Sequence, residues 1–277
     1  MSIFRTLMAL LAALILASPL FAAKREIAIT IDDLPFVGED TNFHLNMIID
    51  ALKTGEVPAT GFVIASKVNP TNWAALQKFR EAGFGIGNHT LTHANLARLS
   101  LESDLHEIDA ADKILSPLME DTTRYFRYPY LAMGNGAKKE RLLQHLQELH
   151  YQIAPITIDS RDFVFNQLLM NIPEKQRRSF LDSLRACYLD FIWQQTIAAE
   201  EHNRINRQSD KPQILLVHAN LLNAYVLPDI INMYRQNGYA FVSLENALAP
   251  ESTRALAQKA AKKSRTGKSI ARFLAWD

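Results

Sequence analysis

The sequence predicts an α/β fold in which parallel strands alternate with helices and curl into a distorted barrel. Short β-rich runs alternate with longer helical patterns about seven times along the chain. The length of 277 residues suits such a barrel better than a small open sheet. With 48% hydrophobic and 21% charged residues, the composition is that of a globular protein with a large core. The 30 Lys and Arg nearly balance the 29 Asp and Glu, so the total charge gives no indication of nucleic-acid binding.

Seven strands are expected between the two ends of the chain. They cover residues 26–31, 59–64, 83–87, 125–128, 152–158, 213–217 and 239–243. Apolar residues at helical spacing predict helices among them over residues 42–54, 72–82 and 101–115. Because the carboxyl ends of parallel strands meet at one edge of a barrel, the polar residues that close these strands are the candidate site residues.

The first 23 residues have the layout of a secretory signal peptide. Arg5 precedes an apolar run over residues 7–16, and the small residues Ala22 and Ala23 follow it. An uncleaved membrane anchor is the alternative interpretation. Because the layout is that of a signal peptide, we expect export, with a periplasmic or cell-envelope location. Cys187 is the single cysteine, which excludes an internal disulfide.

The other end of the chain is a basic tail. Residues 252–277 contain seven Lys or Arg and one acid, a net charge of +6, and the body of the protein is correspondingly acidic. This asymmetry predicts weak contact of the tail with an anionic membrane or wall polymer. A solvated extension without a partner is the alternative.

Acids and histidines close two of the expected strands. Asp32 and Asp33 follow the first strand, and two adjacent acids at a strand end point in different directions, so one can bind a metal while the other handles a proton. His89 and His93 follow the third strand. Histidines four apart converge on one face of a helical turn, an arrangement that suits a divalent cation.

Three further strand ends carry charged or titratable side chains. Arg127 closes the fourth strand, Asp162 lies just after the fifth, and His218 follows the sixth. Each has an ordinary structural explanation by itself, such as a surface ion pair or a strand cap. Their occurrence together at successive strand ends predicts a functional site.

Five short runs at these strand ends occur in a fixed order. They are TIDDLP (30–35), NHTLTH (88–93), RYPY (127–130), DSRD (159–162) and LVH (216–218). The runs resemble the ordered motifs of the polysaccharide deacetylases, also called carbohydrate esterase family four or NodB homology domains. The resemblance implies a distorted parallel (β/α)7 barrel. It also implies a metal-dependent hydrolase that acts on carbon–nitrogen, non-peptide bonds and removes acetyl groups from an N-acetylated polysaccharide.

Position by position, the resemblance implies that Asp33, His89 and His93 bind the metal and that Asp32 is the general base. One carboxylate and two imidazoles leave positions for a water and for the acetyl oxygen. Zn²⁺ is the favoured ion, and Co²⁺, Ni²⁺ or iron also fit such a ligand set.

The same resemblance assigns the remaining roles. His218 would be the general acid, with Asp162 holding it in the charged form. Arg127 would pair with the base and orient it, and the backbone N–H of Tyr130 would stabilise the oxyanion. Leu216 would help to wall a small pocket for the acetyl methyl group.

The chain departs from the family pattern in three places. Ile31 and Leu34 stand where the first motif usually has Phe and Gly, so the turn after the acids must accept a residue with a Cβ. Ile156 stands where the fourth motif usually has Trp, so an aromatic platform for sugar is expected to be missing.

The third departure is a helical insertion before the last motif, at about residues 163–211 of a catalytic domain that covers residues 24–251. We expect a helical cap beside the active-site mouth that contributes aromatic contacts to substrate. A helical pair packed on the outside of the barrel is the alternative.

The expected substrate is peptidoglycan or another glycan that contains N-acetylglucosamine. One alternative is the same barrel acting on small non-peptide amides of the ureide or cyclic imide type, and the signal peptide argues against it. Another alternative is a catalytically silent glycan-binding protein, and the presence of every proposed catalytic group argues against that.

Overall fold

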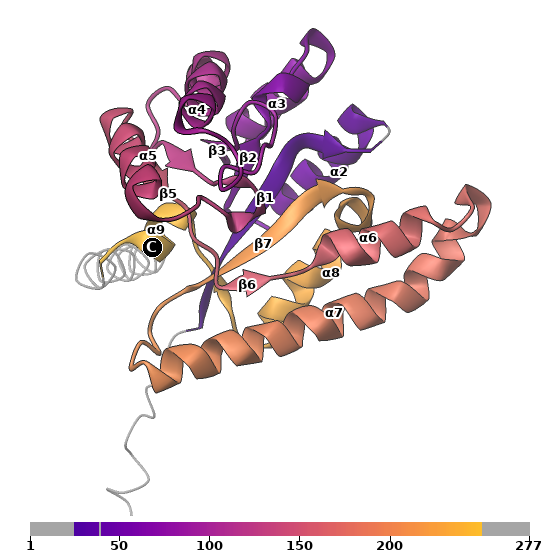
Figure 1. Ribbon diagram of the computed structural model, residues 1–277. Coiled ribbons are helices and arrows are strands. Elements are labelled where there is room, and N and C mark those ends of the chain that lie inside the picture. Colours follow the sequence, from indigo (N-terminus) through magenta and orange to yellow (C-terminus); the bar gives the residue numbers. More distant parts are fainter. Residues whose placement is uncertain (1–24, 39, 251–277) are drawn as a thin grey trace, which may run out of the picture.

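One parallel sheet curls through the molecule and carries helices on its outer side (Figure 1). The computed structural model describes residues 25–38 and 40–250, so the predicted signal peptide and the basic tail lie outside the described residues. The strand order is β5-β4-β3-β2-β1-β7-β6, and a further strand, β8, pairs with β1. This curled parallel path of seven strands confirms the predicted (β/α)7 architecture.

The strands are short except for the two at the centre of the sheet. They are β1 (Glu26–Val37), β2 (Ala59–Val63), β3 (Gly85–Asn88), β4 (Tyr125–Phe126), β5 (Gln152–Ile153), β6 (Ile158–Asp159), β7 (Gln213–Asn220) and β8 (Ala240–Phe241). The α-helices are α2 (Thr41–Thr54), α3 (Pro70–Glu81), α4 (Leu101–Leu115), α5 (Gly136–Glu148), α6 (Asp162–Met170), α7 (Glu174–Ile205), α8 (Leu221–Gln236) and α9 (Leu244–Leu248). Three 3-10 turns are η1 (Ala65–Lys67), η2 (Ser116–Leu118) and η3 (Pro129–Leu131).

The central pair, β1 and β7, forms the most buried part of the core. Ile27, Ile29 and Ile31 on β1 and Leu215 and Val217 on β7 are all at most 1% exposed. Strands that are covered on both faces read as nearly continuous apolar runs, as these two do. The parallel pairing sets Asp32 of β1 directly opposite His218 of β7.

The strand expected over residues 152–158 is instead two short strands, and the prediction of one strand is wrong. β5 pairs with β4, whereas β6 pairs with β7 at the other end of the strand order. Pro155 lies between them, and because proline has no backbone N–H it cannot continue a ladder of hydrogen bonds. One short stretch of chain therefore forms both edges of the described sheet.

Strand β1 runs six residues further than predicted, past the two acids. Its pairing with β2 shifts register between Ile31 and Leu34, and Asp33 within that irregularity has a left-handed backbone with φ of 65°. Leu34 is fully buried and fills the space above Gly61, where any Cβ would collide with it. The left-handed position thus falls on Asp33, and a branched side chain fits where the family pattern has glycine.

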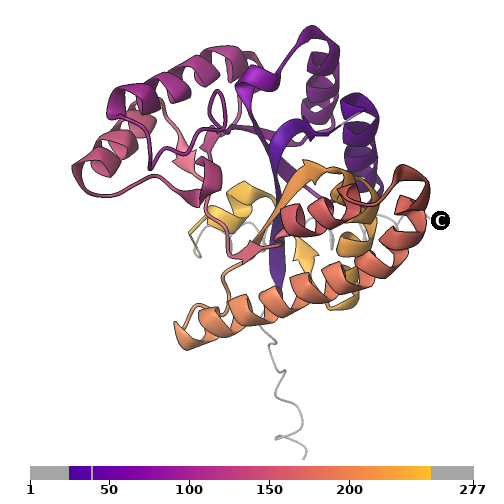
Figure 2. The same cartoon turned by 45° about the vertical axis from the view of Figure 1, so that its right-hand side comes forward.

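The insertion forms helices α6 and α7, which run side by side along one flank of the sheet (Figures 1 and 2). The aromatic residues of α7 pack inward: Tyr188 is fully buried, Phe191 contacts Phe165, and Trp193 contacts Tyr239. This inner side of helix α7 therefore packs on the outside of the barrel. Within residues 25–38 and 40–250, no helix has both the length and the apolarity needed to cross a bilayer.

We predict that Gly87→Ala destabilises the fold. A Cβ at this position in β3 would lie 2.6 Å from the Phe62 ring and 2.9 Å from the Tyr125 carbonyl oxygen. Overpacking of this kind costs about 1–3 kcal/mol, measurable as a lower free energy of unfolding in urea. The control is Glu140→Ala on exposed α5, which should change the free energy by less than about 0.5 kcal/mol. Equal stability of the Gly87 variant and the wild type would contradict this packing.

Candidate functional site

Asp33, His89 and His93 gather at the carboxyl end of the sheet, and their ligand atoms all lie within 4.8 Å of one another. Asp33 Oδ1 is 3.6 Å from His89 Nε2 and 3.3 Å from His93 Nε2. This oxygen is buried and has no hydrogen-bond partner. An unpaired buried carboxylate oxygen is costly by itself, whereas a cation shared with two imidazole nitrogens would satisfy it. The three residues therefore fit a divalent metal.

Both imidazoles can act as neutral ligands. His89 Nδ1 lies 2.7 Å from the Arg127 carbonyl oxygen, so Nδ1 carries the proton and Nε2 keeps its lone pair on the side of Asp33. Burial lowers the pKa of His93 to about 4, with a smaller contribution from His89 and against the opposing effect of Asp33. A neutral ring is the form that binds a metal.

The two histidines are not on a helical turn, and that part of the prediction is wrong. They lie in the loop after β3, where Thr90 and His93 have left-handed backbones with φ of 67° and 63°. The Asn88 side chain accepts from the Thr90 N–H at 2.8 Å, and the Thr90 hydroxyl accepts from the His93 N–H at 3.1 Å. These local bonds replace helical hydrogen bonds and bring the ring centroids to 4.9 Å.

The carboxylates of Asp32 and Asp33 do not point apart as the sequence suggested. Asp32 Oδ2 lies 3.7 Å and Asp33 Oδ1 3.6 Å from the same atom, Nε2 of His89. The left-handed backbone of Asp33 breaks the alternation of a regular strand, which is why both side chains reach one nitrogen. Asp32 is thus a second carboxylate immediately beside the three candidate metal ligands.

Arg127 fixes the position of Asp32. Its guanidinium is 1% exposed and donates to Asp32 Oδ1 at 2.8 Å and to the Thr30 hydroxyl at 2.8 Å. It also donates to the carbonyl oxygens of Ala154 and Pro155, both at 3.2 Å. A buried charge with this many partners is held in one geometry, and so is the carboxylate that it contacts.

His218 and Asp162 form a second charged pair across the site. Nδ1 of His218 lies 2.6 Å from Asp162 Oδ1, and the His218 backbone N–H donates to Asp162 Oδ2 at 2.6 Å. Burial opposes a charge on His218, but the Asp162 carboxylate outweighs it and raises the pKa of His218 to about 10. Burial likewise opposes ionisation of Asp162, yet the bonds from His218 and nearby amides keep the pKa of Asp162 below its usual value.

Two asparagines that the sequence analysis did not identify complete the shell around Asp162. Asn220 Nδ2 donates to Asp162 Oδ2 at 3.1 Å, and Asn223 Nδ2 donates to the same oxygen. Tyr188 donates to Asn223 Oδ1 at 2.9 Å from the inserted helix. The local signal was the Asn220 side chain, which also caps α8, but its contact with Asp162 spans 58 positions and has no sequence pattern.

Two exposed aromatic rings flank the two halves of the site. Tyr130, with a left-handed φ of 56°, is 66% exposed and its ring centroid lies 4.8 Å from that of His93. Phe163 is 53% exposed and meets His218 edge-on at 6.2 Å. Sequence analysis missed Phe163, although it directly follows Asp162. Leu216 is buried in β7, and its role at the acetyl group stays a prediction.

These features, a curled parallel sheet with an Asp–His–His group and a His–Asp pair at its carboxyl edge, define an α/β-barrel with a candidate metal centre at the carboxyl ends of its strands. Residues 22–154 match the sequence profile of the polysaccharide deacetylase family. The predicted resemblance is therefore confirmed at the level of the family.

Individual relatives are distant. The chain is 26% identical over 204 residues to a putative polysaccharide deacetylase, YheN, of Bacillus subtilis, covering 73% of this chain and 63% of the relative. It is 29% identical over 140 residues to a peptidoglycan-N-acetylglucosamine deacetylase of Bacillus cereus, covering 50% of this chain and 47% of the relative. The chain thus spans less than two thirds of the length of these curated relatives.

Among solved structures, the fold is similar to that of a mutant CE4 family pseudoenzyme from Bacillus anthracis with restored enzymatic activity. The TM-score is 0.59 at 20% identity, over 82% of this chain and 68% of that one. This likeness supports the fold alone.

We predict that removing the His218 ring weakens the fold in a pH-dependent way. His218→Gln leaves the buried Asp162 charge without its cation, a loss of about 3 kcal/mol. The pKa of His218 in the folded protein, about 10, lies above its ordinary value of 6.5, so the contribution of charged His218 is full below pH 6.5 and is lost as the pH rises through 10.

The measurement is the free energy of unfolding of wild type and variant at pH 6, 8 and above 10, chosen around the two pKa values. The difference between the two proteins should shrink as the pH rises. His202→Gln, on the exposed side of α7, is the control and should show no such trend. A difference that stays constant over this range would refute the charged pair.

Proposed function

We propose that this protein is a metal-dependent deacetylase that removes acetyl groups from an N-acetylated glycan. The observation that carries the proposal is the buried, unpaired Oδ1 of Asp33, which faces two imidazole nitrogens while a separate carboxylate, Asp32, lies beside them. The match of residues 22–154 to the polysaccharide deacetylase profile supports the reaction class.

Asp33, His89 and His93 would hold the metal. Zn²⁺ is the ion that this carboxylate and imidazole set favours, and Co²⁺ or Ni²⁺ fit the same ligands. When bound, such an ion polarises a carbonyl oxygen and lowers the pKa of water. The protein contributes ligands in the correct protonation state, because the proton of His89 is directed at the Arg127 carbonyl and away from the site.

Asp32 acts as the general base in this proposal. Arg127 keeps its carboxylate oriented through Oδ1, which leaves Oδ2 on the side of the metal group to accept a proton from the attacking water. Addition of the water oxygen to the amide carbon produces an oxyanion. The backbone N–H of Tyr130 would donate to this oxyanion, as the family resemblance implies.

His218 acts as the general acid. The carbon–nitrogen bond breaks only when the leaving nitrogen gains a proton, because a deprotonated amine is a poor leaving group. The Asp162 carboxylate keeps His218 protonated at neutral pH, and the β1–β7 pairing sets it across from Asp32. Base and acid therefore approach the substrate from neighbouring strands.

The proposed substrate is peptidoglycan or another glycan that contains N-acetylglucosamine. The Bacillus cereus relative is named for that sugar in peptidoglycan. The exposed rings of Tyr130 and Phe163 flank the site and offer amphipathic faces to sugar rings, and Leu216 would wall the acetyl methyl. The signal-peptide pattern over residues 1–23 supports export to the compartment that holds this polymer.

We expect the purified chain to bind Zn²⁺ through these three residues. Asp33→Asn and His93→Ala should each weaken binding on the order of 100-fold or more, since each removes a ligand. Titration calorimetry with the metal alone measures this without reference to activity. The control is His145→Ala on α5, whose ring instead pairs with Asp109, and it should leave the affinity unchanged. Equal affinities in all three variants would exclude the assigned ligands.

We expect Asp32→Asn to lower the rate of acetate release from N-acetylglucosamine oligomers about 10²- to 10⁴-fold, the usual worth of a general base. Zn²⁺ binding by this variant should persist, because Asp32 is not one of the three ligands. Asp109→Asn on α4 is the matched control, because this acid is exposed and lies away from the site. Undiminished acetate release by the Asp32 variant would remove it from the mechanism.

A further inference from the structure

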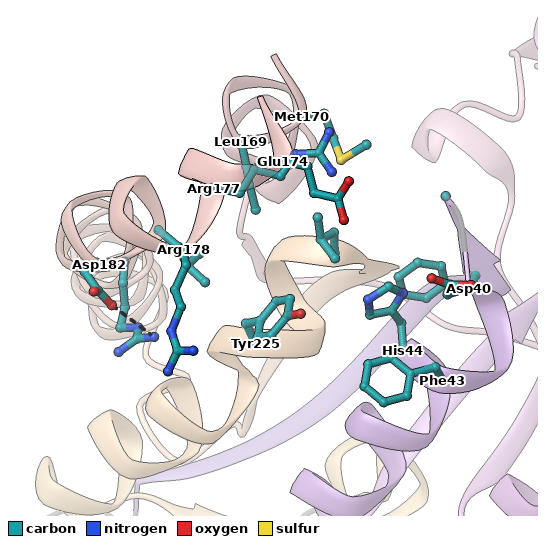
Figure 3. A pocket seen from close by; sticks show the side chains of 15 residues that line it. Asp40, Phe43, His44, Leu169, Met170, Glu174, Arg177, Arg178, Asp182 and Tyr225 are labelled. Carbon is teal, nitrogen blue, oxygen red and sulfur yellow. Dashed lines mark ion pairs between the residues drawn. The ribbon is translucent and has the colours of Figure 1, made fainter. Parts of the chain in front are cut away.

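A pocket of about 810 Å³ lies beside the carboxyl ends of the strands that carry the candidate catalytic groups. It is formed between the start of α2, the turn from α6 to α7, and the start of α8 (Figure 3). We call it the arginine pocket because Arg177, Arg178 and Arg185 of α7 line it. Its volume falls within the usual range for small-ligand sites, roughly 300–1,000 Å³. The metal ligands and the His218–Asp162 pair do not line it.

The arginine pocket is built on the elements that carry the candidate catalytic groups. Strand β1 passes from Asp32 to Phe36 at the pocket, and β7 with His218 leads into Leu221 of α8. Helix α6 begins at Asp162 and ends at Met170 on the pocket wall. At a helical rise of 1.5 Å per residue, Met170 on the pocket wall lies about 12 Å along α6 from Asp162. A ligand longer than one sugar could reach both places.

The arginines of the pocket differ in how they are paired. Arg185 is already matched, by Asp229 at 3.2 Å and Asp182 at 3.8 Å. Arg177 uses Nε to donate to the Ile172 carbonyl at 3.0 Å, which leaves its two terminal amino groups available. Arg178 is exposed and, among the described residues, has neither an ion pair nor a hydrogen bond.

Other charges act on the same space. Asp40 and Glu174 also line the pocket and reduce its positive potential. Three helices, α2, α7 and α8, begin at its rim, and the positive ends of their dipoles act in the opposite direction. Guanidinium groups bind carboxylates as a planar fork with two parallel hydrogen bonds. The terminal amino groups of Arg177 and the guanidinium of Arg178 therefore favour a carboxylate over a neutral group.

The opposite wall is aromatic. Tyr225 of α8 is 42% exposed and Phe43 of α2 is 63% exposed. His44 is stacked on Phe36 at 5.1 Å and is held between these rings. Figure 3 shows Tyr225 at the centre of the pocket, with Arg178 on one side and His44 on the other. Exposed tyrosine and phenylalanine faces provide apolar area for a sugar ring while the polar groups bind its substituents.

We propose that the arginine pocket binds a carboxylate-bearing sugar. This sugar belongs to the same glycan chain that is deacetylated at the candidate metal site of Asp33, His89 and His93. This inference rests on the proposed function and makes the substrate an acidic polymer. Arg178 and Arg177 bind the carboxylate, and Tyr225 supports the sugar ring. The pocket then selects chains in which an acidic sugar lies a short distance from the N-acetyl group to be removed.

The test uses two matched probes on the full chain. One is a tetrasaccharide that alternates N-acetylglucosamine with N-acetylmuramic acid, and the other is the same molecule with its carboxyl groups reduced to alcohols. Titration calorimetry measures the affinity for each, and acetate release is measured separately. Wild type should bind the carboxylate form about tenfold more tightly, as expected for one charge-assisted contact at an exposed site.

Arg178→Gln should abolish most of this preference, whereas Arg178→Lys should keep part of it, since lysine retains the charge but not the fork. Arg204→Gln is the control, because Arg204 lies near the other end of α7, pairs with Glu201 and does not line the pocket. The preference of wild type should also decrease with added salt, a readout that needs no variant.

Equal binding of the two probes by wild type, or a preference that Arg178→Gln leaves intact, would overturn the inference. The outcomes also separate it from the proposed function. Acetate release without any preference between the probes refutes carboxylate binding by the arginine pocket and leaves the proposed deacetylase activity standing. A carboxylate preference that depends on Arg178, in a protein that releases no acetate, supports the pocket and refutes the deacetylase.

Discussion

The buried guanidinium of Arg127 is the contact on which the geometry of the site depends. Its side chain holds Asp32 and its backbone carbonyl accepts from His89, so one residue orients both the candidate base and a candidate metal ligand. The guanidinium lies over the Phe62 ring, with its central carbon 4.4 Å from the centroid. A buried charge is tolerated only when its polar partners are complete, and here they come from two separate segments of the chain, residues 30–32 and 154–155.

Two histidines in the same site have opposite protonation states because their surroundings differ. At His93 the effect of burial outweighs the opposing effect of the Asp33 carboxylate, so the pKa falls and the ring stays neutral. At His218 a buried carboxylate outweighs the same burial and keeps the ring charged. A neutral imidazole suits a metal ligand and a charged one suits a proton donor. The fold thus assigns two roles to one residue type, chiefly by placing the Asp162 carboxylate against His218 and burying His93.

The sequence was sufficient for the architecture and for the order of the polar strand ends, because both follow from local patterns. Local patterns failed where long-range geometry decides. Pro155 divides an apparently continuous strand between two distant partners. The left-handed backbone of Asp33 turns two adjacent acids toward one histidine, and Asn223 reaches Asp162 from 61 positions away. None of these contacts has a periodicity that could be read from the chain.

The split between β5 and β6 has a mechanical consequence. Within the described sheet no backbone ladder joins these two edges, and β4 contacts β1 there through the Arg127 side chain and a buried cluster that includes Ala28, Tyr125 and Ile214. Separating the strands along this line disturbs side-chain contacts and the connection through residues 154–157, whereas separating other neighbours breaks backbone hydrogen bonds. The split therefore lacks the backbone pairs that join the other neighbouring strands, and it lies between the loop that bears His89 and His93 and the strand that bears His218.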